Sequence, residues 1–483
     1  MVGTPGAHTD TPRSSKTDDL AFAGAARQAE LLRERQVSAR ELVGLYLERI
    51  ERLDPSLNAF RVVLGDQALA EAERAQARLD AGETAPLLGV PVAIKDEFDV
   101  AGQLNTCGCD AGQEPARADS EVVRRLRAGG AIPIGITNVP ELTIWPFTET
   151  KTWGKTRNPW DPERAPGGSS GGSGAAVAAG LAPVALGSDG AGSIRIPAAW
   201  CGLFGLKPQR GRISYRPLAE HWHGMSVPGP LARRVLDAAL FLDTVAGPAP
   251  GDAIAVPEPA EPFAAAAQRA PRPLRVAMSL KVPPLVTARA SAQSRRAVEH
   301  TAELLRSLGH EVHERDPHYG LAFSHALRRY LRGIRDDVRA LPDQERLERR
   351  TRGMARLGAL VPAAGVARSR KAEPQVSARV NSLFREFDVL ITPVTARPAP
   401  AVGKWEGRGA IRTLNGAAWH CPFTAMWNLT GQPAAAVPAG LDDAGMPLSV
   451  QLIGQPNDEA TLLSLAGQME AQRPWAELRP AIG

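Results

Sequence analysis

The order of apolar and polar positions along the chain predicts helices first. From residue 20 to residue 60, apolar side chains recur at the three- and four-residue spacing of an amphipathic helix, which predicts two or three helices at the start of the fold. Ser38 and Glu41, three residues apart, are typical of a helix N-terminal capping box. Residues 1–18 are polar, and we expect a flexible tail there.

Short apolar runs then alternate with helical patterns. "GVPVAIKD" and "AIPIGITN" read as strands, and "SEVVRRLRAGG" between them reads as a helix. The alternation continues through "LRVAMSL", "SAQSRRAVEHTAELLRSLGHEVHE", "FDVLITPV" and "AAAVPAGL". This order predicts the α/β class. Residues 320–385 have the pattern of a helical insertion.

Two glycine-serine loops stand out in residues 165–198, "APGGSSGGSGAAVAAGLAPVALGSDGAGSIRIPA". The small residues between the loops predict a closely packed helix, and "PVALGSD" predicts a strand that leads into the second loop. Both loops therefore lie at the ends of secondary-structure elements, where functional residues are commonly held.

Several functions compete for these loops. A nucleophile elbow is formally matched at Ser169 and Ser170, but an elbow follows a buried strand, and "RNPWDPERAPG" before these serines is rich in turn residues. A phosphate loop needs Lys followed by Ser or Thr, and a dinucleotide loop needs a G-x-G-x-x-G after a strand; both patterns are missing. Glycines that only turn the chain are the remaining alternative.

A serine nucleophile needs a base, and no histidine lies near either loop. A lysine can take this role when it is neutral, and burial among apolar groups lowers the pKa of an amine. Lys95 ends an apolar strand upstream of the loops. A lysine at a strand end is ordinarily a surface charge, so this interpretation needs a second observation.

Composition narrows the class of protein. The chain has 483 residues, a length typical of about three domains, and 43% are hydrophobic. It has no apolar run of the roughly 18 residues that span a bilayer and no signal-peptide pattern, so we expect a cytoplasmic protein. The net charge of +5 comes largely from residues 328–356, where acids are interleaved, which indicates a solvated helix and no nucleic-acid site. The cysteines have neither disulfide-framework nor zinc spacing: Cys107, Cys109, Cys201 and Cys421.

The loop sequence resembles the signature of the amidase signature family, serine hydrolases with a Ser, cis-Ser, Lys triad. The resemblance extends through "GVPVAIKD", "GITNVPEL", "WGKTRNPWD", "GLKPQRGRIS", "FDVLITP" and "NLTGQPAAAVP". It implies one large α/β/α domain over residues 19–483, built around a mixed twisted sheet flanked by helices, in place of three domains.

The resemblance also implies the catalytic residues. Ser193 is the nucleophile that forms an acyl-enzyme, Ser169 is the bridging serine, and Lys95 is the base, so the two serines and the lysine relay one proton. The peptide bond from Gly168 to Ser169 is expected to be cis.

Backbone N–H groups of the second loop are expected to stabilise the oxyanion of the transition state. These predicted donors are Gly190, Ala191, Gly192 and Ser193. Around them, Ser170, Asp189 and Arg195 are predicted to support the loops through hydrogen bonds. His221 and His223 are further pocket candidates, but two histidines without a third ligand do not make a metal site.

Large apolar side chains outside the signature predict a pocket for a bulky or aryl group. The candidates for this pocket are Trp145, Phe147, Trp222, Met225 and Trp427, with Trp419 and Phe423 in the same segments.

We therefore expect an amidase, free of metal and organic cofactor, that acts on small amides and also on carbamates (urethanes) or esters. The A subunit of a transfer-RNA-dependent amidotransferase shares the signature and is the alternative, although "LAEHWHGMSVPGP" differs from the stretch typical of that subunit. Neither a nucleic-acid nor a membrane partner is predicted, and the protein is expected to be a monomer or homodimer.

Overall fold

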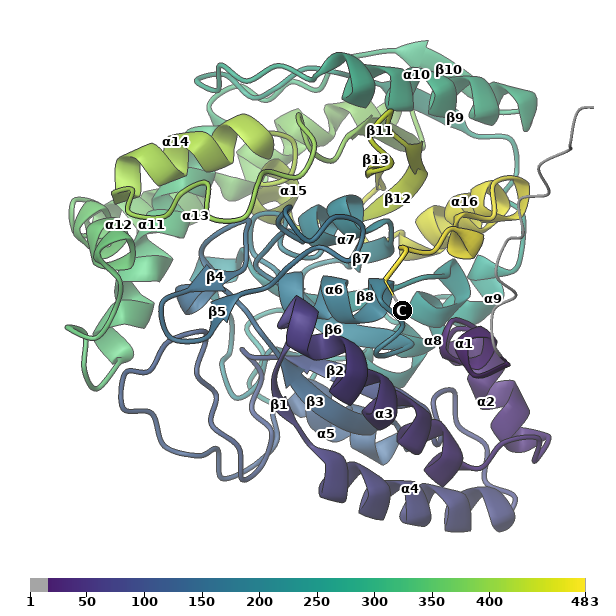
Figure 1. The fold of residues 1–483 in the computed structure, drawn as a ribbon. Coiled ribbons are helices and arrows are strands. Elements are labelled where there is room, and N and C mark those ends of the chain that lie inside the picture. The colour runs from purple at the N-terminus through teal and green to yellow at the C-terminus, as the bar shows by residue number, and fades with distance from the viewer. Residues whose placement is uncertain (1–15, 483) are drawn as a thin grey trace, which may run out of the picture.

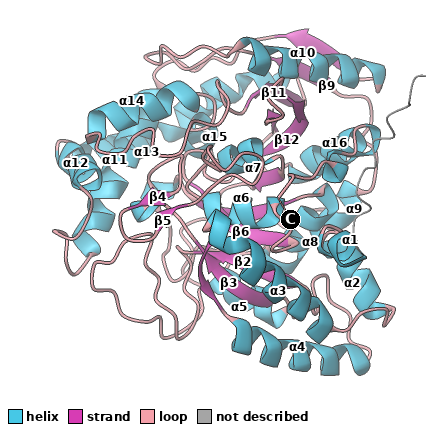
Figure 2. Ribbon diagram, in the orientation of Figure 1, coloured by secondary structure: helices cyan, strands magenta, loops and turns pink. Residues whose placement is uncertain are grey.

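An eleven-stranded mixed sheet forms the centre of the computed structural model, which describes residues 16–482 (Figure 1). Helices flank this sheet, and loops connect the two kinds of element (Figure 2). The predicted α/β class and the mixed sheet are confirmed. The predicted tail lies outside the described residues except for residues 16–18, which begin the first helix.

In sheet order, the strands are β1 (Phe60–Val63), β3 (Ile132–Thr137), β2 (Pro91–Lys95), β6 (Val184–Asp189), β8 (Val227–Ala232), β7 (Phe204–Lys207), β12 (Ala434–Leu441), β13 (Pro447–Ile453), β11 (Val389–Pro393), β9 (Arg275–Met278) and β10 (Glu311–Glu314). β2 pairs in parallel with both β3 and β6, while β8 pairs antiparallel with β6. A separate two-stranded ribbon consists of β4 (Glu149–Thr150) and β5 (Gly154–Lys155).

The helices, in chain order, are α1 (Lys16–Ala21), α2 (Ala25–Arg33), α3 (Ala39–Leu57), α4 (Gly65–Asp80), α5 (Glu121–Ala128), α6 (Gly171–Ala178), α7 (Arg195–Cys201), α8 (Val235–Val245), α9 (Phe263–Ala267), α10 (Ala292–Ser307), α11 (Ala322–Ala340), α12 (Arg349–Ala359), α13 (Ala363–Val380), α14 (Ala410–His420), α15 (Met426–Thr430) and α16 (Glu459–Gln472). Short 3-10 turns occur at η1 (Glu141–Thr143), η2 (Trp222–Gly224), η3 (Asn381–Arg385) and η4 (Trp475–Glu477).

The capping box that the sequence predicts at the start of α3 is present. Ser38 Oγ accepts a hydrogen bond from the Glu41 backbone N–H at 3.2 Å, and the Glu41 carboxylate accepts one from the Ser38 N–H at 2.8 Å. These bonds satisfy two backbone donors that would otherwise have no partner in the first turn.

Ser38→Ala is expected to lower the free energy of unfolding by about 1 kcal/mol, because it removes the acceptor for the Glu41 N–H. Urea unfolding followed by circular dichroism measures the change. Glu41→Gln is the matched control, since glutamine also completes a capping box. Equal stability of Ser38→Ala and the wild type would mean that the box contributes nothing to stability.

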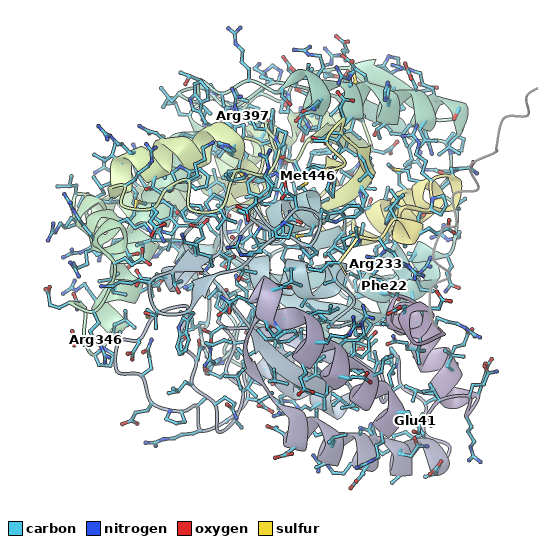
Figure 3. The ribbon with its side chains drawn as sticks, viewed as in Figure 1. Phe22, Glu41, Arg233, Arg346, Arg397 and Met446 are labelled. Carbon is cyan, nitrogen blue, oxygen red and sulfur yellow. The ribbon has the colours of Figure 1, made fainter. Side chains whose placement is uncertain are left out.

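The N-terminal helices are held to the rest of the chain around one aromatic ring. The guanidinium carbons of Arg49, Arg233 and Arg479 lie 5.3, 4.8 and 4.7 Å from the centre of the Phe22 ring. Figure 3 shows Arg233 and Phe22 next to each other. Because a cation over an aromatic face is attracted to it, these contacts join segments from both ends of the chain.

Two central strands are wholly buried. Every residue of β2 and of β6 is buried, as expected for parallel strands with both faces covered. α6 packs on these strands, and its alanines and glycines allow the close approach. The core thus holds the ends of β2 and β6, which carry the predicted site residues.

Residues 320–385, for which a helical insertion was predicted, contain α11, α12, α13 and η3. These helices lie near α14 at the left of Figure 1, and α11 packs against η2 and α15. In the described part of the chain, no helix has both the length and the apolar character of a membrane span.

Candidate active site

The ends of two adjacent parallel strands bring Lys95 to the serine loops. β2 ends at Lys95 and β6 ends at Asp189, and carboxyl ends of parallel neighbours lie at one edge of the sheet. Lys95 Nζ donates to Ser188 Oγ at 2.6 Å and to Ser169 Oγ at 2.7 Å. The lysine is completely buried, so the surface-charge alternative is wrong.

The two serine loops lie against each other. The Ser170 N–H donates to the Ser193 carbonyl at 3.2 Å, and Ser170 Oγ donates to the Ser188 carbonyl at 3.2 Å. The peptide bond between Gly168 and Ser169 is cis, as expected. Lys95 and Ser169 are therefore hydrogen-bonded to each other, and the residue after Ser169 is bonded to the backbone of Ser193, which lies at the wall of a pocket.

Glu97 is part of this site although the sequence did not predict it. One oxygen of its carboxylate lies 2.8 Å from Lys95 Nζ and also accepts a hydrogen bond from Ser188 Oγ. The other accepts one from the Tyr215 hydroxyl at 2.5 Å. Burial raises the pKa of Glu97, but Lys95 and His221 outweigh burial and lower this pKa below its usual range. Glu97 is therefore a buried carboxylate.

His221 lies between two carboxylates. Its Nδ1 is 3.5 Å from Glu97 Oε1, and its Nε2 is 3.3 Å from Asp337 Oδ2 on α11. Burial lowers the pKa of His221, but Asp337 and Glu97 together raise it to about 10. The ring is therefore an imidazolium at neutral pH.

The other histidine of this segment faces elsewhere. His223 Nε2 lies 3.2 Å from Asp336 Oδ2, so His221 and His223 contact different carboxylates. Over residues 16–482, no cluster of three or more His, Cys, Asp and Glu side chains could hold a metal ion.

One of the predicted oxyanion donors is already occupied. The Gly192 N–H donates to Asp189 Oδ1 at 2.7 Å, so it cannot also bind a substrate oxygen, which corrects the prediction for this residue. Among the described residues, no acceptor is bound to the N–H groups of Gly190, Ala191 and Ser193. Position 192 instead requires glycine, because its φ is +125° and a Cβ there would lie 2.5 Å from Thr424 Oγ1.

A buried ion pair between Asp189 and Arg195 supports this loop. Both side chains are completely buried, and Arg195 Nη2 donates to Asp189 Oδ1 at 2.7 Å. Burial raises the pKa of Asp189, but Arg195 outweighs burial and lowers it well below its usual range. Arg195 also donates to Gln451 at 2.6 Å, and Asn428 donates to the Asp189 carbonyl at 2.6 Å. Neither Gln451 nor Asn428 was predicted, because both come from distant segments.

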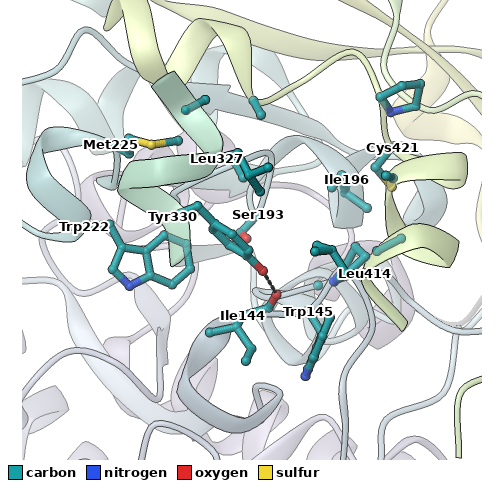
Figure 4. A pocket seen from close by; sticks show the side chains of 18 of the residues that line it. Ile144, Trp145, Ser193, Ile196, Trp222, Met225, Leu327, Tyr330, Leu414 and Cys421 are labelled. Carbon is teal, nitrogen blue, oxygen red and sulfur yellow. Dashed lines mark hydrogen bonds between the residues drawn. The ribbon is translucent and has the colours of Figure 1, made fainter. Parts of the chain in front are cut away.

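The pocket at Ser193 has almost entirely apolar walls (Figure 4). It encloses about 810 Å³ of space between protein atoms, some of it open to solvent. Its large lining side chains are Ile144, Trp145, Ile196, Trp222, Met225, Phe323, Leu327, Tyr330 and Leu414. Asp, Glu, Lys, Arg and His are all missing from the lining residues, which belong to the described part of the chain.

Three of the five residues predicted for a substrate pocket line this pocket, and two do not. Trp145, Trp222 and Met225 line the pocket. Phe147 lies in the core behind it, where its ring stacks on Trp405 with 4.5 Å between centroids. Trp427 is also in the core, and its indole N–H donates to the Phe423 carbonyl at 3.0 Å. Of the two residues from the same segments, Phe423 is buried and Trp419 is 47% exposed.

Two turns beside the pocket hold non-glycine residues in the left-handed region. Leu142 and Thr143 of η1 have φ values of +50° and +56°, and Trp222 and His223 of η2 have +47° and +54°. Such a conformation costs of the order of 1–3 kcal/mol per residue and is found most often at functional sites. The two turns place Thr143 and Trp222 on the pocket wall.

Known proteins resemble this chain over most of its length. The Amidase family model matches residues 41–463. A Mycobacterium tuberculosis (strain ATCC 25618 / H37Rv) protein named "Putative amidase AmiB2" is 54% identical, over 96% of this chain and 99% of its own. The 6-aminohexanoate-cyclic-dimer hydrolase of Paenarthrobacter ureafaciens is 34% identical, over 95% of this chain and 96% of its own.

Solved structures resemble the whole fold. A 6-aminohexanoate cyclic dimer hydrolase complexed with substrate superposes with a TM-score of 0.87 at 32% identity, covering 96% of this chain and 99% of that chain. A bacterial aryl acylamidase of the amidase signature family superposes with a TM-score of 0.84 at 26% identity, covering 94% and 97%. With the family model spanning most of the sequence, the chain belongs to the amidase signature family and is a hydrolase of carbon–nitrogen bonds in amides.

Proposed function

We propose that this amidase hydrolyses amides through an acyl-enzyme on Ser193, with Ser169 and Lys95 as its proton relay. Ser193 Oγ attacks the carbonyl carbon while its proton passes to Ser169, and the Ser169 proton passes to neutral Lys95. The relay returns the proton to the leaving amine. Water then enters, and the same groups deprotonate it as it cleaves the acyl ester. The buried hydrogen bond of 2.7 Å from Lys95 to Ser169 supports this relay.

The negative charge that develops on the carbonyl oxygen needs hydrogen-bond donors. The backbone N–H groups of Gly190, Ala191 and Ser193 are the candidates, because the Gly192 N–H is bound to Asp189. Donors held in place before the reaction stabilise the transition state without a reorganisation cost. The buried ion pair of Asp189 and Arg195 holds the loop that carries them.

The substrate class follows from the pocket, and this observation carries the proposal. Its walls are apolar and aromatic, and among residues 16–482 no charged side chain lines them. A charged substrate group would lose its hydration there without gaining a partner. We therefore infer a neutral amide with a bulky apolar or aryl group. The relatives named as a cyclic dimer hydrolase and an aryl acylamidase support this class.

Among p-nitroanilides with one leaving group, the heptanoyl or benzoyl compound is expected to have a kcat/KM about ten- to a hundredfold above that of the acetyl compound, because each buries apolar area in the pocket. The matched comparison is heptanoyl against 6-aminohexanoyl, which differ chiefly by a terminal ammonium group. We expect the ammonium compound to be the poorer substrate. Equal kcat/KM values across the series would contradict the apolar pocket while leaving amide hydrolysis in place.

The same series addresses the amidotransferase alternative. Glutamine, the ammonia donor of such enzymes, carries an ammonium and a carboxylate, and the described pocket has no charged side chain for either. Hydrolysis of an apolar anilide by the isolated chain supports a stand-alone amidase. If the isolated chain hydrolysed only glutamine, or needed partner subunits, the alternative would be correct.

Esters and carbamates can react with Ser193 by the same kind of acyl transfer, so action on them stays a prediction. Cytoplasmic location and a monomeric or homodimeric state also stay predictions.

A further inference from the structure

One face of α11 runs from the substrate pocket toward Glu97. Phe323, Leu327 and Tyr330 line the pocket, and farther along the same helix lie Gly333 and Asp337. These residues follow one another at spacings of three and four, so they share one face of the helix. The insertion therefore contacts both the pocket and the polar groups behind it.

Trp222 joins α11 to the predicted oxyanion loop. A Cβ on Gly333 would lie 2.7 Å from the Trp222 ring, and a Cβ on Gly190 would lie 2.6 Å from it. The indole is thus packed closely between the helix and the loop. Its Nε1 donates to Asp337 Oδ2 at 2.7 Å, which holds the ring in the pocket wall.

The same Asp337 carboxylate contacts His221, and the opposite side of that ring faces Glu97. The Tyr215 hydroxyl also lies 3.3 Å from His221 Nδ1, but burial raises the pKa of Tyr215 well above its usual value, so this group is neutral. Burial likewise keeps the pKa of the nearby Cys107 thiol well above its usual value. The charges facing the His221 ring are therefore the two carboxylates.

These contacts form an unbroken path: Asp337 to His221, His221 to Glu97, and Glu97 to Lys95. Glu97 lies between Lys95 and the His221 imidazolium. If His221 lost its charge, its repulsion of a second positive charge at Lys95 would disappear while the attraction of Glu97 stayed, which favours the protonated form of the amine. A lysine that must accept a proton from Ser169 would then be a poorer base.

We propose that Asp337 is a positioning residue for the Lys95 relay: it keeps His221 charged and oriented against Glu97, and through Trp222 it ties this arrangement to the pocket wall. This inference rests on the proposed function. According to this proposal, α11 has two roles: it lines the substrate pocket, and through Asp337 it positions the groups around Lys95.

The test is the pH dependence of Asp337→Asn. Amide is nearly the same size as carboxylate but has no charge, so the pKa of His221 should fall from about 10 toward the range of ordinary histidines. The ratio of variant to wild-type kcat is expected to decrease by about tenfold as pH rises from about 6 to about 9, because His221 loses its charge over that range only in the variant. KM should change less than kcat.

Asp336→Asn is the matched control on the same helix. Asp336 contacts Arg332 at 2.8 Å and His223 at 3.2 Å, and it is no part of the path to Lys95. Its pH profile is expected to run parallel to that of the wild type. Thermal unfolding of both variants separates loss of fold from loss of positioning, and NMR titration of the His221 ring reports its pKa without any substrate.

His221→Gln completes a double-mutant cycle. Because the pH-dependent effect of Asp337 passes through His221, adding Asp337→Asn to His221→Gln should cause no further pH-dependent loss. The inference is overturned if Asp337→Asn runs parallel to the wild type, if the His221 pKa does not move, or if the pH-dependent loss persists without His221. A wild type that hydrolyses no amide would overturn the proposed function and this inference together.

Discussion

Ser193→Ala is expected to lower kcat for amide hydrolysis by about 10⁵-fold or more, because no other group in the proposed mechanism forms the acyl-enzyme. Ser193 lines the pocket and is only 9% exposed, so the change removes one oxygen and leaves the shape of the site. Steady-state kinetics on an apolar anilide measures the loss. Substrate should still bind, which equilibrium dialysis of the variant can show.

Ser173→Ala is the control for this change. Ser173, on α6, is also a buried serine, but its hydroxyl bonds to Thr137 Oγ1 at 2.8 Å and to the Leu186 carbonyl at 3.1 Å. It is expected to cost stability and leave kcat within a small factor of the wild type. If Ser193→Ala also retained a kcat within a small factor of the wild-type value, Ser193 would not be the nucleophile.

The second large effect is expected from the base and the bridging serine. Lys95→Met and Ser169→Ala should each lower kcat by about 10³-fold or more, since each interrupts the same proton path. Because residues that act as one unit lose their function together, the double variant should be little worse than either single one. A double variant that lost the product of the two factors would show that the groups act independently.

Lys207→Met provides the matched control for the lysine. Lys207, on β7, is also completely buried, and its amine donates to the Pro208 carbonyl at 2.9 Å. Burial lowers the pKa of Lys207 well below its usual value. Its replacement should change the free energy of unfolding and leave most of kcat. An equal loss of kcat in both lysine variants would mean that any buried lysine near the core is needed for the fold.

Much of the fold can be read from local sequence. β2, β3 and β6 lie within runs that predict strands, and α3 begins where Ser38 and Glu41 predict its capping box. These signals are local because a strand buried on both faces needs a continuous apolar run and a helix start needs its own side-chain acceptor.

β8 shows where local rules fail. Its sequence, "VPGPLA", contains Pro228 and Pro230, and prolines ordinarily argue against a central strand. The strand nevertheless pairs with β6 along its whole length. β7 pairs only with Leu231 and Ala232, so on that side no ladder requires an N–H from either proline. This tolerance depends on how far a neighbouring strand extends.

The sequence alone could not predict which aromatic side chains face the pocket. Trp145 and Phe147 are two positions apart in one segment, yet Trp145 lines the pocket and Phe147 stacks on Trp405 in the core. Composition alone indicates that both are buried. Which of them faces the cavity is decided by distant residues packed on the segment, such as Trp405 on Phe147.

By itself, the sequence determined the family and the α/β class, and it predicted catalytic roles for Lys95, Ser169 and Ser193, because these inferences depend on residue types at short, characteristic spacings. Only the tertiary structure decided that Glu97, beside Lys95, also faces His221, and that Asp337 of α11 contacts His221. The physical reason is distance along the chain: charges far apart in sequence interact strongly only when folding buries them together, away from water.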